Sequence, residues 1–204
     1  MIVLGLTGSI GMGKSAVAAM FRAEGVPVFD ADAEVHRLQG PGGALVCAID
    51  AAFPGTATPG GIDRAVLARY VLGDKAALQR LERLIHPVVR IARRNFLRRN
   101  RARPLVVLDI PLLYEKGHES GLDIVAVVSA PVWKQRRRVL ARPGMSIAKL
   151  NHILALQVPD HIKRRRADVV IDTGTQIHRT RSQIRRLIAC LTVKQSRYSE
   201  LCGK

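Results

Sequence analysis

Short apolar runs rich in Val, Ile and Leu alternate along the chain with longer stretches in which apolar residues recur every three or four positions. The short runs are typical of buried parallel strands, and the longer stretches are typical of crossover helices. The pattern therefore predicts an α/β fold with a mostly parallel, five-stranded sheet. We expect its strands at residues 2–7, 27–29, 105–110, 124–129 and 169–172.

Two connections between these strands are far too long for one crossover helix. The first, about residues 33–103, begins with turn-rich segments and continues with a strong helical pattern from about 74 to 101. We expect a helical insertion there, in which His86-Pro87 should kink or restart the long helix. The apolar positions of that helix share one face and are Leu78, Leu81, Leu84, Ile85, Val88, Ala92 and Phe96.

The second long connection, about residues 131–166, carries a run of arginines around 136–142 and a basic run, Lys163-Arg164-Arg165-Arg166. We expect it to form a mobile basic lid. Gln135, Arg138 and Arg142 recur at spacings of three and four residues, so one helical face presents all three. That face is either a solvated surface or a source of positive charge for a phosphate ligand.

The composition limits the class of protein. With 33 Lys and Arg against 16 Asp and Glu, the formal charge is +17, which favours anionic ligands as a class. One Trp, three Tyr and four Phe leave few surfaces for base stacking, so we expect no specific nucleic acid partner. Three widely spaced cysteines predict neither a disulfide framework nor a zinc site. No run approaches the roughly 20 apolar residues of a membrane span, and we expect a soluble, cytoplasmic protein of a single domain.

The strongest local motif is Gly8-Ser9-Ile10-Gly11-Met12-Gly13-Lys14-Ser15, which matches G-x-x-x-x-G-K-[ST] directly after the first expected strand. Glycines at these positions let backbone N–H groups surround phosphates, and a lysine neutralises the β and γ oxygens. The Ser15 hydroxyl can bind Mg²⁺. The motif predicts a phosphate-binding loop for ATP. Its expected contacts are Gly8, Gly11, Met12, Gly13, Lys14, Ser15 and Ala16, largely through the backbone.

Acidic residues follow two of the expected strands. Asp30 and Asp32 come after the second strand, and Asp109 lies at the end of the third. Ligands gather at the carboxyl ends of parallel strands, so these carboxylates should face the cleft, where one can accept a proton from an acceptor hydroxyl. The alternative for one of the first pair is to cap the next helix. His86 is a lone histidine, which more often has a structural role than a catalytic one.

Taken together, the motifs resemble those of the dephospho-coenzyme A kinase family over essentially the whole chain. The resemblance rests on the phosphate-binding loop, Asp30-Ala31-Asp32, His86-Pro87, Asp109-Ile110-Pro111-Leu112-Leu113-Tyr114-Glu115, the lid residues, Gln157, and the segment from Ala167 to Gly174. Members of this family commonly carry an Asn-containing segment where this chain has Asp172-Thr173-Gly174-Thr175.

The resemblance implies a three-layer P-loop NTPase fold with a helical substrate-binding insertion and a lid. It implies transfer of the γ-phosphoryl group of ATP, with Mg²⁺, to the ribose 3′-hydroxyl of dephospho-coenzyme A, the final step of coenzyme A biosynthesis. Asp32, Lys14 and Arg142 match catalytic positions, and Arg138 and Arg142 match contacts to ATP. Asp32, His86, Asp109 and Leu112 match the substrate side.

Two other functions compete with this interpretation. A kinase for nucleoside monophosphates or another small molecule would use the same core chemistry. A basic nucleic-acid-binding ATPase would also carry the loop and the charge, although the chain has no RNA-binding or helix-turn-helix signature. The oligomeric state does not follow from the sequence.

Overall fold

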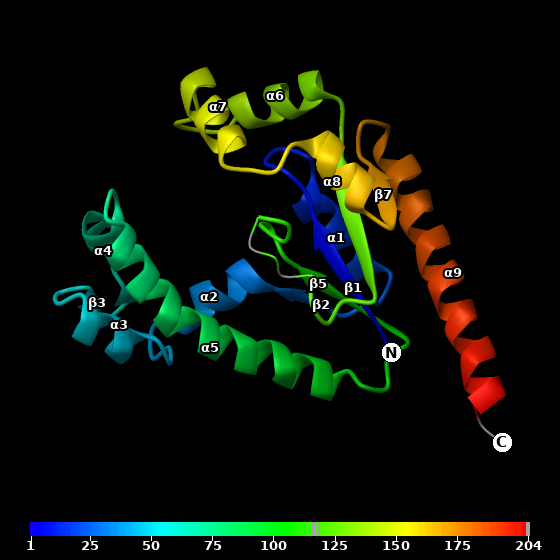
Figure 1. The fold of residues 1–204 in the computed structure, drawn as a ribbon, viewed down its shortest axis with the longest axis horizontal. Helices are drawn as coiled ribbons and strands as arrows, with labels where there is room; N and C mark the ends of the chain where they lie inside the picture. Colours follow the sequence, from blue (N-terminus) through cyan, green and yellow to red (C-terminus); the bar gives the residue numbers. More distant parts are fainter. Residues whose placement is uncertain (116, 118, 203–204) are drawn as a thin grey trace. The chain divides into compact units, whose positions relative to one another are not determined.

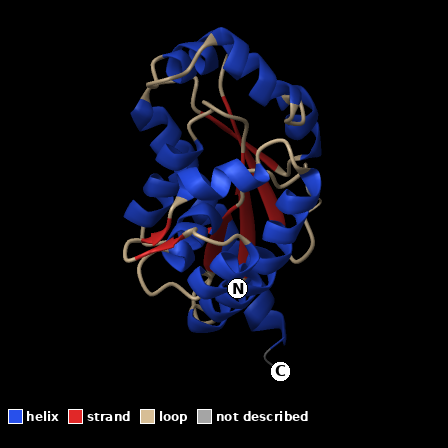
Figure 2. Ribbon diagram, turned by 90° about the vertical axis from the view of Figure 1, so that its left-hand side faces the viewer, coloured by secondary structure: helices blue, strands red, loops and turns tan. Residues whose placement is uncertain are grey.

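The computed structural model describes residues 1–115, 117 and 119–202, with side chains placed through Val193. Five strands form one sheet in the spatial order β2, β5, β1, β6, β7 (Figures 1 and 2). The pairings of β1 with β5, of β1 with β6 and of β6 with β7 are all parallel. The strands are β1 (Ile2–Thr7), β2 (Val28–Asp30), β5 (Leu105–Asp109), β6 (Ile124–Ser129) and β7 (Val169–Asp172).

The predicted α/β fold and five-stranded sheet are confirmed, and three strands have the expected bounds. The expected strand at 27–29 begins and ends one residue later, and the strand expected at 105–110 ends at Asp109. The Ile110 N–H still donates to the Leu6 carbonyl at 2.9 Å. Pro111 follows and has no N–H to continue the ladder.

Helices cover both faces of this sheet. On one face α1 (Lys14–Ala23) and α9 (Ile177–Cys202) pack through Val17, Phe21 and Ile184, which share an apolar cluster with alternate residues of the strands. On the other face, Val125 and Val127 of β6 pack with Leu113 and Tyr114. Helix α8 (Asp160–Arg166) also contacts β6. Burial on both faces explains why β1, β5 and β6 are continuous apolar runs, whereas Val170 of the edge strand β7 is 38% exposed.

The chain divides into two compact units. The core unit comprises Met1–Phe29 and Asn100–Lys204, and the helical unit comprises Asp30–Arg99. The helical unit has its own apolar centre around Leu45, Ile49 and Phe53. Its elements are α2 (Ala31–Gln39), α3 (Val46–Ala52), β3 (Ala57–Thr58), β4 (Gly61–Ile62), α4 (Arg64–Val71) and α5 (Lys75–Arg99).

Helix α5 corrects two expectations. It continues through Pro87 as one helix, so of the two expected effects the restart does not occur, and the kink stays a prediction. A proline removes one backbone hydrogen bond of the many in a 25-residue helix, and the apolar face around Leu81 and Ile85 stays packed in the helical unit. Leu78 was expected on the buried face but is 44% exposed, whereas Val89 packs against the cluster.

The expected lid consists of α6 (Val132–Leu140), α7 (Ile147–Ala155) and α8. Trp133 on α6 is 59% exposed, and the neighbouring Lys134 ammonium donates to the Gly174 carbonyl at 2.5 Å. Arg142 and the arginines of α8 are exposed, as expected of a basic surface. That this segment moves as a lid stays a prediction.

Lys163 departs from the expected basic surface because its side chain is fully buried. Its ammonium lies 2.7 Å from Glu115 Oε1, and the same oxygen accepts the Val158 N–H at 2.9 Å. A charged group excluded from water needs a paired counter-charge, which Glu115 supplies. The pair therefore ties α8 and the end of the α7–α8 connection to the segment after β5.

Cys47 and Cys190 are exposed free thiols, and the side chain of Cys202 lies outside the described residues. Within the part of the chain that the structure describes, no helix is both long enough and apolar enough to cross a membrane.

The buried pair gives a testable stability difference. Glu115→Gln leaves the Lys163 charge buried without a counter-ion and should lower the free energy of unfolding by about 3 kcal/mol or more. The matched control is Glu119→Gln, which breaks the half-exposed pair of Glu119 with Arg166. Arg166 lies on α8, as Lys163 does. That change should cost less than about 1 kcal/mol. Urea denaturation checks both values, and equal losses would contradict this account of the pair.

Candidate active site

The phosphate-binding loop connects the end of β1 to the start of α1. Gly11 and Gly13 adopt positive φ angles of 75° and 91°, a region that residues with a Cβ rarely adopt. A Cβ on Gly11 would also lie 2.4 Å from Val139 Cγ2. Gly13 is the N-cap of α1. The Lys14 and Ser15 N–H groups in the first turn therefore have no intrahelical acceptor and suit an anion.

Lys14 pairs with Asp109 within this site. The Lys14 ammonium lies 2.5 Å from Asp109 Oδ1, and the two side chains are 18% and 3% exposed. The register of β1 with β5 places Asp109 opposite Leu6, one residue before the end of β1. The ammonium is thus held at the carboxyl edge of the sheet, next to the loop.

The start of helix α2 shows which of Asp30 and Asp32 caps the helix, a question that the sequence left open. Asp30 is the N-cap, with Oδ1 accepting the Ala33 N–H at 2.9 Å. Arg37 binds Glu34 at 2.7 Å, and this hydrogen bond lowers the pKa of the Glu34 carboxyl. Asp32 is exposed in the first turn, and among the described residues the structure records no partner for it. Of these acids, Asp32 is the one left available for an external group.

The two lid arginines have different surroundings. Arg142 is exposed just beyond the end of α6. Arg138 is partly buried, and its Nη1 lies 3.4 Å from the Gly11 carbonyl, while its Nη2 donates to the Thr173 carbonyl at 2.8 Å. In this structure Arg138 thus contacts the loop backbone rather than open solvent.

The remaining predicted residues lie in both units. Gly8 is buried, and Ala16 is exposed in the first turn of α1. Met12 contributes its backbone to the loop while its side chain lies in the core. Leu112 is 36% exposed after β5. Asp32 and His86, both exposed, belong to the helical unit, whereas the loop, Asp109 and the lid arginines belong to the core unit.

The sequence did not identify the side chains that hold the loop from outside. Gln135 Nε2 donates to the Ile10 carbonyl at 2.8 Å, and Gln157 Oε1 accepts the Ile10 N–H at 3.1 Å. Thr173 donates to the Met12 carbonyl at 2.6 Å. All three residues stood within the family motifs, but nothing in their spacing indicated the loop backbone as partner.

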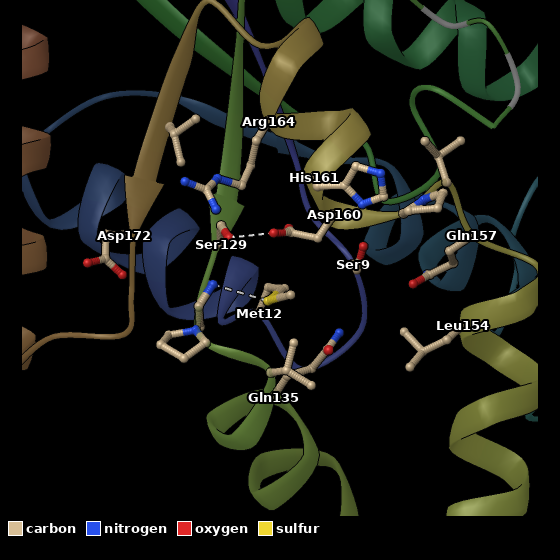
Figure 3. A pocket seen from close by; sticks show the side chains of 16 residues that line it. Ser9, Met12, Ser129, Gln135, Leu154, Gln157, Asp160, His161, Arg164 and Asp172 are labelled. Atoms are coloured by element: carbon tan, nitrogen blue, oxygen red, sulfur yellow. Dashed lines mark hydrogen bonds between the residues drawn. The ribbon is translucent and has the colours of Figure 1, made fainter.

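A cavity of about 790 Å³ lies beside the loop (Figure 3). Its lining is mainly apolar and includes Ser9 and Met12 of the loop, Gln135 of α6 and Gln157. Ser129 at its centre donates to Asp160 Oδ2 at 2.7 Å. Lys14 and Asp109 do not line it. The cavity thus meets the loop at Ser9 and Met12 and not at the Lys14–Asp109 pair.

Residues 2–179 match the dephospho-CoA kinase family. A dephospho-CoA kinase of Novosphingobium aromaticivorans is 58% identical over 195 residues, which cover 96% of this chain and 97% of that protein. A crystal structure from Thermus thermophilus is similar with a TM-score of 0.80 and 37% identity, covering 92% of this chain and 96% of the other. A dephospho-CoA kinase from Campylobacter jejuni, at 21% identity and a TM-score of 0.65, covers 93% and 96% and shares the fold.

The family match and the high identity extend over nearly the whole chain, so they include the loop, the Lys14–Asp109 pair and the lid as well as the sheet. The chain belongs to the dephospho-CoA kinase family of P-loop phosphotransferases.

Proposed function

We propose that this kinase transfers the γ-phosphoryl group of ATP to the ribose 3′-hydroxyl of dephospho-coenzyme A, giving coenzyme A and ADP. The observation that carries the proposal is the ion pair of Lys14 with Asp109 beside a loop of left-handed glycines. This is the arrangement a P-loop kinase needs for a triphosphate. The acceptor follows from the name of the relatives that match nearly the whole chain. Both reactants are small, water-soluble molecules, and we place the reaction in the cytoplasm.

The core unit supplies the groups for the donor. N–H groups of the loop and of the first turn of α1 bind phosphate oxygens, and Lys14 offsets their charge. Asp109 keeps the Lys14 ammonium at the edge of the sheet until a phosphate approaches. Since the pair is nearly buried, this positioning requires little reorganisation when ATP binds.

Mg²⁺ fits this site as a partner of ATP rather than as a resident ion. No group of three or more His, Cys, Asp or Glu side chains in the described parts of the chain is arranged to hold a metal ion. Ser15 lies in the first turn of α1 and is exposed, so its hydroxyl is available as one ligand. Mg²⁺ commonly takes few protein ligands and completes its shell with water and phosphate oxygens, and it would neutralise charge on the β- and γ-phosphates.

The helical unit supplies the acceptor side in this proposal. Asp32 orients the 3′-hydroxyl and takes its proton. The transition state of phosphoryl transfer is loose in most analyses, so a carboxylate of ordinary basicity suffices late in the reaction. His86 and Leu112 are proposed contacts for dephospho-coenzyme A. Arg142 is proposed to reach the phosphates when the lid closes and to stabilise the charge on the transferred group.

The substrate is tested with purified protein, Mg-ATP and a panel of acceptors. We expect turnover with dephospho-coenzyme A and little or none with AMP, CMP, shikimate or single-stranded RNA, with the product phosphorylated at the 3′ position. Folded Lys14→Ala protein is the control and should lose nearly all turnover. A preference for AMP would favour the nucleoside monophosphate kinase alternative, and stimulation by RNA would favour the nucleic-acid-binding one.

The proposed role of Asp32 can be tested separately from the capping role of Asp30. Asp32→Asn removes the proposed base from an exposed position, so kcat should fall by about a hundredfold or more while the melting temperature stays unchanged. Asp30→Asn should leave both nearly unchanged, because Asn caps a helix as well as Asp does. Steady-state kinetics and thermal melts check the pair. Near-normal kcat in Asp32→Asn would refute the base assignment.

Arg142 should act on the transition state more than on bound ATP. Arg142→Lys keeps one charge but loses the planar fork, so kcat should fall about ten- to a hundredfold with little change in the Kd of ATP. Arg136→Lys, an exposed change on α6, is the matched control and should change neither value. A weaker Kd with kcat preserved would show instead that Arg142 is a ground-state contact.

A further inference from the structure

Three consecutive carbonyls of the phosphate-binding loop point away from its phosphate side and accept hydrogen bonds from side chains. The acceptors are Ile10, Gly11 and Met12, and the donors come from α6 and from the residue that follows β7. The bonds are Gln135 Nε2 to Ile10 O at 2.8 Å, Arg138 Nη1 to Gly11 O at 3.4 Å and Thr173 Oγ1 to Met12 O at 2.6 Å.

These bonds also fix the direction of the loop amides. In a trans peptide unit the C=O of one residue and the N–H of the next point in opposite directions. The Ile10 carbonyl held outward therefore turns the Gly11 N–H toward the other side, whereas the Met12 N–H donates to the Ser9 carbonyl within the loop at 3.1 Å. The Met12 carbonyl controls the Gly13 N–H in the same way. With positive φ at Gly11 and Gly13 alternating with ordinary φ at Met12, the loop has the form of an anion-binding nest.

Thr173 makes the shortest of the three bonds and is itself firmly held. The side chain is buried, and the Thr173 N–H donates to the Ser129 carbonyl at 2.9 Å. Arg138 Nη1 donates to the Thr173 hydroxyl oxygen at 3.1 Å and its Nη2 to the Thr173 carbonyl at 2.8 Å. A hydroxyl has one proton, and of the two carbonyls within reach, Met12 at 2.6 Å is a much closer acceptor than Ser129 at 3.3 Å.

The contact is also close on the glycine side. A Cβ built on Gly13 would lie 3.1 Å from Thr173 Oγ1, so the hydroxyl touches the loop where α1 begins. Loss of the hydroxyl would leave the Met12 carbonyl short of its donor and allow the peptide unit between Met12 and Gly13 to rotate. The Gly13 N–H would then no longer be held toward the phosphates.

We propose that Thr173 is a positioning residue for ATP: its hydroxyl, backed by Arg138, holds the Met12 carbonyl outward and thereby aims the Gly13 N–H at the phosphates. The proposal rests on the proposed function, because it assumes that the loop binds ATP. The effect of Thr173 is on the affinity for the nucleotide and not on the acceptor.

Thr173→Ala and Thr173→Ser isolate the hydroxyl, because both lose the methyl group and only alanine loses the oxygen. Thr180→Ala is the matched control. Thr180 is likewise buried, and its hydroxyl donates at 2.9 Å to the carbonyl of Asp172, the residue before Thr173. The measurements are the Kd of Mg-ATP by calorimetry, the KM of dephospho-coenzyme A and the melting temperature of each protein.

We expect Thr173→Ala to weaken ATP binding about tenfold, a loss of about 1.4 kcal/mol, and to leave the KM of dephospho-coenzyme A unchanged. Thr173→Ser should bind ATP within about twofold of the wild type. Thr180→Ala should also bind ATP within about twofold of the wild type. We expect this even if Thr180→Ala lowers the melting temperature as much as Thr173→Ala does. If the alanine variant is too unstable to measure, Thr173→Val replaces it, because valine keeps the volume and lacks the hydroxyl.

The outcomes separate this inference from the proposed function. Wild-type protein that binds no ATP would overturn both. Wild-type protein that binds ATP, with Thr173→Ala or Thr173→Val binding equally well, would overturn the positioning role alone. Thr173→Ser as weak as Thr173→Ala would also overturn it, because the loss would then belong to the methyl group. Equally weakened ATP binding in Thr180→Ala would also overturn it, because the loss would then come from a general loosening of the segment after β7.

Discussion

Strand β1 lies between β5 and β6, with parallel partners on both edges, and its register with β5 sets Leu6 opposite Asp109. The rest of the phosphate site depends on this pairing. The chain leaves the sheet at Thr7 and forms the glycine loop. It returns as α1, whose first residue, Lys14, reaches back to Asp109. A shift of β5 by one residue would send the carboxylate to the opposite face of the sheet, away from the ammonium.

The other half of the sheet holds the same loop from its outer side. The register of β6 with β7 sets Ser129 beside Asp172, and Thr173 follows within reach of the Met12 carbonyl. Gln135 and Arg138 approach from α6, the first helix of the expected lid. Two of the side chains that hold the loop therefore come from α6, and the third comes from the residue that follows β7.

The sequence predicted the sheet and the phosphate-binding loop well because both depend on local patterns. A strand buried on both faces is a continuous apolar run, and β1 and β6 have the expected bounds. The edge strand β7 also has the expected bounds, although Val170 is exposed. The loop motif fixes residue types at close spacing. The sequence left open whether Asp30 or Asp32 caps α2, because an aspartate can serve either as a helix cap or as a base. The Ala33 N–H bond to Asp30 identifies Asp30 as the cap.

Other features depend on partners that are distant in the sequence. Lys163 belongs to a basic run, and its burial follows only from Glu115, which lies about fifty residues earlier. Thr173 reaches Met12 across most of the chain. The two-residue strands β3 and β4 are too short to show an alternating pattern. The expected restart at Pro87 does not occur, because the apolar face of α5 outweighs the loss of one backbone bond.

The exposed tryptophan at the start of α6 has a practical consequence. Trp133 is the only tryptophan in the chain, so the whole indole emission of the protein arises from one position. Its neighbour Lys134 bonds to Gly174, which places this position beside the segment that leads from the last strand into α9. The protein thus carries a built-in optical reporter at the start of α6, and no labelling chemistry or added residue is required to observe that region.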